Sequence, residues 1–453
     1  MPTEQQRPEQ RPQHPADRYE AQTGHIRRAF DQTGVGIEVA TSEEPPGEAD
    51  FLFERGTILV RDQDLARVLE VEPARGATRR DNLINGLTLL ELREENRQRT
   101  LDVLDEIDRE VGVGVATPNH VLSITPISHC PATEPEEVPD RADPDPGVCP
   151  CPGDGSGVFV DVVDTGLLDG APARHAWLDG VQGGRDPFPQ PPAQGASMPP
   201  YTGHGTFIAG VARCMAPSVQ VFVEALFMQG GAALESEVIR RLHIALDRQP
   251  DIISLSAGTY TRRGLPSLGF EVFLERLRHH KGVVLVAAAG NDGIRRRFWP
   301  AAAPGVVAVG ALAANWRSRA PFSNHGSWVD LYAPGEDLVN AFAIGDFVCT
   351  EPPHLGERRS FQGMARWSGT SFSTPLVAGL IAARMSRTGE NGQTAAAALL
   401  ATARAQAIHG LGAILLPCLD DGADHGKGSC GCHGHEHHRD PHCGHGHHRC
   451  AHC

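Results

Sequence analysis

A serine among small residues stands late in the chain, at the start of a long apolar stretch. The motif Ser-Gly-Thr-Ser-Phe-Ser-Thr-Pro occupies 368–375, and the Ala-rich stretch 376–385 behind it predicts a helix. A serine hydroxyl is a weak nucleophile until a neighbouring base takes its proton. The first turn of a helix offers free N–H groups and the positive end of the helix dipole, which stabilise an oxyanion. Ser371 is therefore a candidate nucleophile for acyl transfer.

Three other polar residues have the chemistry that such a serine needs. Asp164 ends a predicted buried strand, and its carboxylate can orient an imidazole. His204, between two glycines and before an apolar helix-like stretch, can act as the base. Asn291 ends another predicted strand, where its amide can reach an oxyanion. Taken singly, they can also be a turn aspartate, a helix-capping histidine and an asparagine suited to left-handed backbone.

The chain order Asp164, His204, Asn291, Ser371 favours the catalytic interpretation, because four such coincidences in one order are improbable. This order of triad members is that of subtilisin. The chain resembles the subtilisin-like serine peptidases, the subtilase or S8 family, over roughly residues 157–402. The segments that carry the resemblance are 162–166, 203–206, 252–258, 288–291, 299–310, 333–335 and 369–371.

The resemblance implies an α/β fold with a doubly wound, mainly parallel sheet flanked by helices. It implies a serine endopeptidase that forms an acyl-enzyme and needs no cofactor for catalysis. Asp164, His204 and Ser371 would form the triad, and Asn291 would donate to the oxyanion. The residues expected to bind substrate are Ser256, Ala257, Gly258, Ala289 and Gly290.

Two local features qualify this expectation. Phe207 stands where many family members carry a second histidine, so the fit of substrate and any structural calcium sites cannot be predicted. The run Arg295–Arg297 follows the oxyanion asparagine and either favours acidic substrates or forms a solvated basic loop. By the same resemblance, Ala257, Gly258, Ala289 and Gly290 would border the pocket for the residue before the scissile bond, and their small size suggests a roomy apolar pocket and broad specificity.

The residues before the catalytic region predict a second, smaller domain. Residues 1–49 are rich in Gln, Pro and Glu and are expected to be disordered, whereas 50–125 show a β-α-β-α-β pattern typical of a small α+β domain. Its position resembles that of the family's pro-region, which implies a zymogen with an intramolecular inhibitor. The alternative is an accessory domain that is never removed. Residues 126–156 form a Pro/Asp/Gly-rich linker, and self-cleavage is expected within 130–157.

The region after the predicted peptidase domain (157–410) is a tail, 411–453, dominated near its end by His, Cys and Gly. Imidazole and thiolate are ligands of zinc, nickel and copper, so the tail is predicted to bind such a metal loosely. The alternative is a low-complexity segment with no ligand role. The candidate ligands are Cys430, Cys432, His433, His435, His437, His438, Cys443, His445, His447, His448, Cys450 and Cys453. Cys149 and Cys151 in the linker can pair with this tail or share its metal.

Composition limits the partners. A net charge of −15 argues against nucleic acid or an anionic membrane as the main partner, and no stretch is long enough to span a bilayer. The first residues lack an apolar core, so we expect a cytoplasmic protein or export by an unrecognised route. The 11 cysteines are expected to be reduced. We expect a monomer that acts on polypeptides. A metal-binding scaffold without turnover and a non-proteolytic acyl hydrolase are the competing hypotheses.

Overall fold

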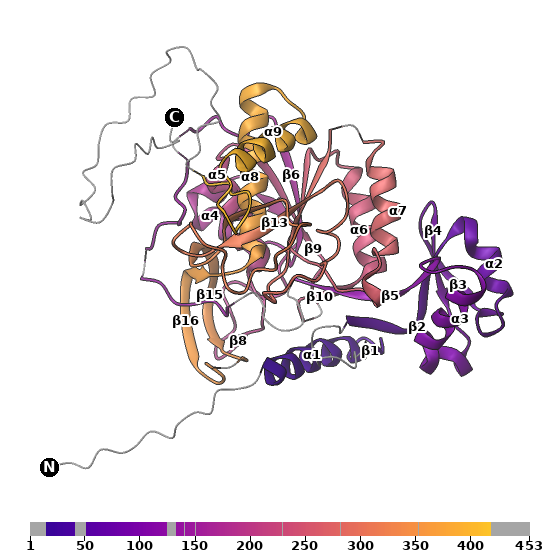
Figure 1. The fold of residues 1–453 in the computed structure, drawn as a ribbon. Coiled ribbons are helices and arrows are strands. Elements are labelled where there is room, and N and C mark those ends of the chain that lie inside the picture. The colour runs from indigo at the N-terminus through magenta and orange to yellow at the C-terminus, as the bar shows by residue number, and fades with distance from the viewer. Residues whose placement is uncertain are drawn as a thin grey trace.

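The computed structural model describes residues 15–40, 51–124, 133–139, 141–149, 151–228, 230–280, 282–351 and 353–417 (Figure 1). Its centre is a seven-stranded sheet in which all neighbouring strands are parallel, in the order β14-β13-β12-β11-β6-β9-β7. The strands are β6 (Phe159–Asp164), β7 (Gln182–Gly183), β9 (Gln220–Ala225), β11 (Ile252–Leu255), β12 (Val284–Ala288), β13 (Val306–Leu312) and β14 (Leu331–Pro334). The central strands consist mainly of Val, Ile, Leu and Ala because both faces are covered, with Asp161 and Ser254 as buried exceptions.

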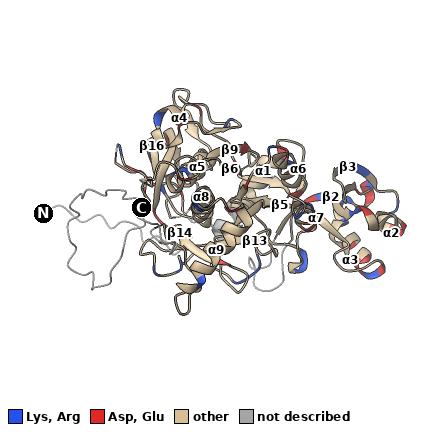
Figure 2. Ribbon diagram, turned by 90° about the horizontal axis from the view of Figure 1, so that it is seen from above, with Lys and Arg blue, Asp and Glu red and all other residues tan. Residues whose placement is uncertain are grey.

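Helices cover both faces of this sheet, as Figure 1 shows. They are α4 (Ala171–Arg174), α5 (His204–Met215), α6 (Glu235–Leu246), α7 (Leu268–Leu277), α8 (Thr370–Thr388) and α9 (Gly392–Ala405). Val162 of β6 packs in one core with α5, α8 and α9, whereas the next residue, Val163, packs in a second core with α6 and α7. The predicted doubly wound α/β fold is confirmed. Figure 2 shows few charged residues on α5 and α8 at the centre of the molecule.

A smaller antiparallel sheet precedes the large one. It contains β2 (Phe51–Arg61), β3 (Thr78–Ile84), β4 (Leu87–Glu91) and β5 (Ala116–Ser123), with helices α2 (Leu65–Glu70) and α3 (Thr100–Glu110). One face of this sheet packs on α2 and α3. Its other face, including Leu59, Leu89 and Leu122, packs in the same core as α6 and α7. The small α+β domain is therefore present, and its sheet is docked on the helices of the large domain.

The N-terminal segment differs from the expectation. The interpretation of residues 1–49 as disordered is wrong for α1 (Pro15–Asp31) and β1 (Ile37–Ala40), which pairs with β2. Ile26 and Phe30 lie on one face of α1 and pack with Val121 of β5 and with β10 (Ala232–Leu234). The few apolar residues here are ordered by tertiary contacts that composition does not reveal.

The linker follows the surface of a third, small sheet. This sheet has the order β16-β15-β8 and consists of β8 (Ser197–Met198), β15 (Leu338–Val348) and β16 (Arg358–Trp367). Glu136 forms a bridge to Arg366 of β16, and Asp145 forms one to Val339 of β15. The described part of the linker is thus hydrogen-bonded to the large domain, although it contains no helix or strand.

The large domain continues slightly beyond the predicted boundary at 410. Ile414 bridges to Tyr332 of β14, and the two residues pack in one apolar cluster. The predicted tail ligands, Cys430 to Cys453, lie outside the described residues. None of the described helices is both long and apolar enough to cross a membrane.

The packing of α1 can be tested by truncating Phe30, whose side chain is completely buried. We expect Phe30→Ala to weaken the docking of α1 by about 3–5 kcal/mol, because a large buried ring is removed. Hydrogen exchange of the α1 amides should become faster, while exchange in α8 stays unchanged. The exposed neighbour Arg27→Ala is the control. Unchanged protection of α1 in Phe30→Ala would contradict the packing.

Candidate active site

The carboxyl edge of the parallel sheet brings the predicted acid and base together. Asp164 is the last residue of β6, and His204 is the first residue of α5. The Nδ1 atom of His204 lies 2.8 Å from Oδ1 of Asp164, and the Thr165 backbone N–H donates to the same oxygen at 2.8 Å. Both side chains are completely buried. An imidazole that donates through Nδ1 leaves Nε2 unprotonated and able to accept a proton.

Aromatic rings hold the histidine from two sides. The His204 ring centroid lies 5.4 Å from that of Trp367, in an edge-on arrangement, and 5.4 Å from that of Phe372. Phe207 packs against Phe372 with centroids 4.5 Å apart and the two rings tilted by 49°. The phenylalanine that replaces a second histidine therefore has a packing role. These aromatic contacts could not be predicted, because the positions of Trp367 and Phe372 in the sequence do not indicate that they contact His204.

Ser371 lies in the first turn of α8, as its sequence predicted, and its side chain is buried. Its Oγ donates to the carbonyl oxygen of Ile124 at 3.4 Å. No hydrogen bond from Oγ to His204 is present among the described residues, and His204 Nε2 is buried without a partner. The structure thus brings Asp164, His204 and Ser371 to one place, with a backbone carbonyl of the small domain at the serine.

The predicted oxyanion donor is fixed by a residue whose role the sequence did not reveal. Thr370 donates to Asn291 Oδ1 twice, through its backbone N–H at 2.8 Å and its hydroxyl at 2.9 Å. Thr370 Oγ1 also accepts from the Gly290 N–H at 3.2 Å. With its oxygen held in this way, the amide Nδ2 of Asn291 is buried and lacks an acceptor. A buried, unsatisfied donor beside Ser371 is suited to an oxyanion.

The predicted substrate-binding strand already carries a partner. Ser123 and Gly258 exchange two backbone hydrogen bonds of 3.0 Å each, and Ile124 N donates to Gly231 O at 3.0 Å. β5 also pairs antiparallel with β10. The end of β5 therefore lies between Gly258 and β10 as an added strand. The Ser256 side chain is not bonded to β5, because its hydroxyl donates to the Ser371 carbonyl at 2.9 Å.

The glycines expected to border a roomy pocket have a different neighbour. A Cβ atom at Gly258 would lie 2.4 Å from Phe298, and one at Gly290 would lie 2.5 Å from Asn324 and 3.1 Å from Phe298. Phe298 thus fills the space beside both glycines, and their small size does not by itself imply an open pocket. Ala257 and Ala289 are buried nearby, and no contact assigns them a role in specificity.

Asp186 is a further buried carboxylate near the site that the sequence did not single out. Its Oδ2 accepts from the N–H of Gly203, the residue before His204, and its Oδ1 accepts from Phe188 N, both at 2.9 Å. Burial is the main cause that raises the pKa of Asp186 from 3.8 to about 6, with a smaller contribution from the charge of Asp164. Asp186 holds the turn that begins α5.

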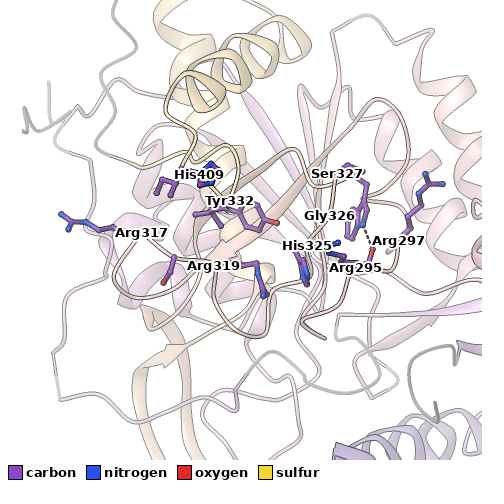
Figure 3. Close-up of a pocket in the computed structure, with 14 residues that line it drawn as sticks. Arg295, Arg297, Arg317, Arg319, His325, Gly326, Ser327, Tyr332 and His409 are labelled. Carbon is purple, nitrogen blue, oxygen red and sulfur yellow. Dashed lines mark hydrogen bonds between the residues drawn. The ribbon is translucent and has the colours of Figure 1, made fainter. Parts of the chain in front are cut away.

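The three arginines of the run 295–297 do not lie on one surface. Figure 3 shows Arg295 and Arg297 in a basic pocket of about 880 Å³. Its other basic or imidazole lining residues are Arg317, Arg319, His325 and His409. Arg296 points elsewhere, with its guanidinium 4.6 Å from the centroid of the Tyr260 ring. None of the predicted catalytic or substrate-binding residues lines this pocket, so the structure does not support the acidic-substrate interpretation.

The described residues contain one cluster with the donors that a metal requires. Cys149, Cys151 and Asp154 have ligand atoms within 4.8 Å of one another. The cluster lies in the linker and in the turn before β6, away from Ser371.

A buried Asp–His pair beside a serine at a helix N-terminus has the form of a serine hydrolase triad. The sequence model of the Subtilase family matches residues 155–446. The chain therefore belongs to the subtilase family, as the sequence motifs predicted.

Individual relatives agree with this assignment. A thermophilic serine proteinase of Bacillus sp. (strain AK1) is 30% identical over 247 residues, which are 50% of this chain and 52% of the relative. Subtilisin Savinase of Lederbergia lenta is 29% identical over 237 residues, 50% of this chain and 76% of the relative. Fervidolysin of Fervidobacterium pennivorans, a keratinolytic enzyme related to subtilisin, shares the fold with a TM-score of 0.53 and 18% identity, over 81% of this chain and 60% of that one. The chain spans about half the length of the first of these relatives.

The hydrogen bonds around Thr370 can be tested with Thr370→Val, which keeps the shape and removes the hydroxyl. It leaves Gly290 N–H without its acceptor and leaves Asn291 Oδ1 held by the Thr370 backbone N–H alone. We expect kcat on a short peptide to fall about tenfold with little change in KM, the effect of one or two hydrogen bonds. Thr374→Val is the control, because its hydroxyl donates only to the Thr370 carbonyl. An unchanged kcat would show that Thr370 does not position the amide.

The raised pKa of Asp186 predicts a pH dependence of stability. The folded state holds this proton more tightly than the unfolded state, so the stabilisation is complete below pH 3.8 and is lost as the pH rises through about 6. Between pH 4 and 7 the free energy of unfolding should fall by roughly 2 kcal/mol more in the parent chain than in Asp186→Asn. Urea unfolding in a Ser371→Ala background measures this. The exposed control Asp346→Asn should keep the parent slope, and an equal slope in Asp186→Asn would refute the assignment.

Proposed function

We propose that the protein is a serine endopeptidase made as a zymogen, and that residues 51–124 are its inhibitory pro-region. The triad is Asp164, His204 and Ser371. The observation that supports this proposal most directly is the contact of 3.4 Å between Ser371 Oγ and the carbonyl oxygen of Ile124. The last residue of the pro-region thus occupies the position of the residue before a scissile bond.

The reaction follows from the groups around this carbonyl. His204 Nε2 takes the hydroxyl proton as Ser371 Oγ attacks the carbonyl carbon, and Asp164 stabilises the imidazolium. The developing oxyanion is held by Asn291 Nδ2 and by the N–H of Ser371, which lies in the first turn of α8, where backbone donors lack intrahelical acceptors. The imidazolium then protonates the leaving amine, and water releases the acyl group.

The contacts of β5 favour a pro-region over an unrelated accessory domain. Its end pairs with Gly258 and β10 as an extended substrate would. Its polar side chains are also matched inside the large domain: His120 Nδ1 lies 2.7 Å from Glu235 Oε2, and Asn119 accepts from Ser236 N at 3.0 Å. An accessory domain with another role would have no reason to place its last strand along the substrate-binding edge.

The same geometry revises the expected point of self-cleavage. The sequence pointed to the linker region 130–157, yet Ile124 is the residue whose carbonyl lies at Ser371. We therefore propose cleavage of the bond between Ile124 and Thr125. The Ile124 side chain is buried in the apolar core shared by Ala257 and Leu255, which favours an apolar residue before the scissile bond.

We also propose that the tail binds a transition metal, and its amino-acid composition is the only support for this. Its dense imidazoles and thiols, separated by glycines, favour loose binding of zinc, nickel or copper. The catalytic steps above do not involve the tail.

Intact mass spectrometry of the parent chain beside Ser371→Ala tests the zymogen proposal. We expect the parent to yield a fragment that begins at Thr125, and Ser371→Ala to remain full length because it lacks the nucleophile. Ser373→Ala is the matched control on the same helix turn, since its hydroxyl donates to the Ala333 carbonyl and not to the site. A fragment that begins at Thr125 in Ser371→Ala would refute self-processing. Cleavage at another bond would refute the assignment of Ile124.

A further inference from the structure

Three side chains with metal-ligand chemistry converge where the linker meets the large domain. Cys149 and Cys151 flank one residue of the linker, and Asp154 follows in the turn that leads to β6. The Cys149 Sγ and Asp154 Oδ2 atoms are 3.7 Å apart, and all three donor atoms lie within 4.8 Å of one another. Cys149 and Cys151 are partly exposed, so an ion can reach the cluster from solvent.

The separation between Cys149 Sγ and Asp154 Oδ2 suits a tetrahedral ion. With metal–sulfur and metal–oxygen bonds of about 2.3 and 2.1 Å at a tetrahedral angle, the sulfur and oxygen atoms would lie about 3.6 Å apart. The distance of 3.7 Å between these two atoms agrees with this value. Two thiols and one carboxylate are a donor set for zinc, because hard cations such as magnesium and calcium prefer oxygen alone.

The backbone that carries the three donors is fixed from both sides. Cys149 N donates to Cys214 O at the end of α5, and Ser218 N donates to Asp154 O, both at 2.8 Å. Gly155 N donates to Ser386 Oγ of α8 at 2.8 Å. The donors therefore converge on a rigid framework, which lowers the ordering cost of metal binding.

The surroundings of Cys149 favour a bound cation. The Cys151 N–H points at Cys149 Sγ at 3.5 Å, an arrangement that stabilises a thiolate. A divalent ion bound to the sulfur would stabilise the same thiolate, because it would be the largest positive charge in the site.

We propose that Cys149, Cys151 and Asp154 form a zinc site with three protein ligands and one open coordination position. Each thiol releases its proton to solvent when it binds the ion. The bound ion would join Cys149, whose N–H is bonded to the end of α5, to the turn 151–155, whose Gly155 N–H is bonded to α8. The site therefore fastens the part of the linker that remains attached to the large domain after processing.

Zinc-dependent protection from alkylation tests this site in the full chain. Trypsin releases residues 142–174, between Arg141 and Arg174, and this peptide contains Cys149 and Cys151 as its only cysteines. The reduced protein is treated with N-ethylmaleimide with and without zinc, which is supplied in excess so that the tail cannot deplete it. Mass spectrometry then follows this peptide alone. Cys214, which is completely buried, must stay unmodified and reports that each variant is folded.

We expect zinc to suppress alkylation of Cys149 and Cys151, and EDTA to restore it. Protection should be lost in Asp154→Asn and retained in Asp143→Asn, an exposed aspartate of the same linker. Equal alkylation with and without zinc would overturn the proposal, as would full protection in Asp154→Asn. Resistance to alkylation that only a reductant relieves would also overturn it, because the two cysteines would then form a disulfide.

Discussion

The buried hydrogen bond between Asp164 and His204 is the interaction on which the rest of the site depends. A completely buried carboxylate is costly unless donors compensate it, and here His204 Nδ1 and Thr165 N both lie 2.8 Å from Oδ1. These donors are in place only because β6 ends at this edge of the sheet and α5 begins beside it. The close packing of α5 with α8 then brings Ser371 to the same edge. The doubly wound sheet is thus a requirement of the chemistry.

Strand β5, which lies between Gly258 and β10, is held by side-chain hydrogen bonds as well as by its backbone pairing. His120 and Glu235 are both completely buried and 2.7 Å apart, and Glu235 also accepts from Ser267 and from Gly269 N. If β5 left, Glu235 would lose the His120 bond and Ser236 N would lose its acceptor on Asn119. Because unmet buried polar groups are costly, the proposed pro-region would stay bound after the proposed cleavage, until water or another chain replaces these contacts.

The sequence predicted the parts of the structure that local patterns encode. The central strands are mainly apolar. Asp164, His204 and Ser371 lie at the ends of elements, and Asn291 follows β12 by three residues, all among small residues, so both could be found. Strand β3 was missed because its residues are mainly polar, and α1 was missed because its order comes from contacts with β5 and β10. The role of Thr370 and the place of Ile124 at the serine depend on long-range contacts, which no local spacing reveals.

The hydrogen bond of the Ser371 hydroxyl must change before the serine can attack a carbonyl. Ser371 Oγ donates to the Ile124 carbonyl, while His204 Nε2 and Asn291 Nδ2 have no partner among the described residues. Attack needs the hydroxyl proton to turn toward Nε2, after which the carbonyl oxygen can accept from Asn291. The Thr133 carbonyl accepts from Trp367 Nε1 at 2.7 Å, and Trp367 packs against His204. Part of the linker therefore lies close to the histidine, and the proposed reaction would begin with rotation of the Ser371 hydroxyl toward it.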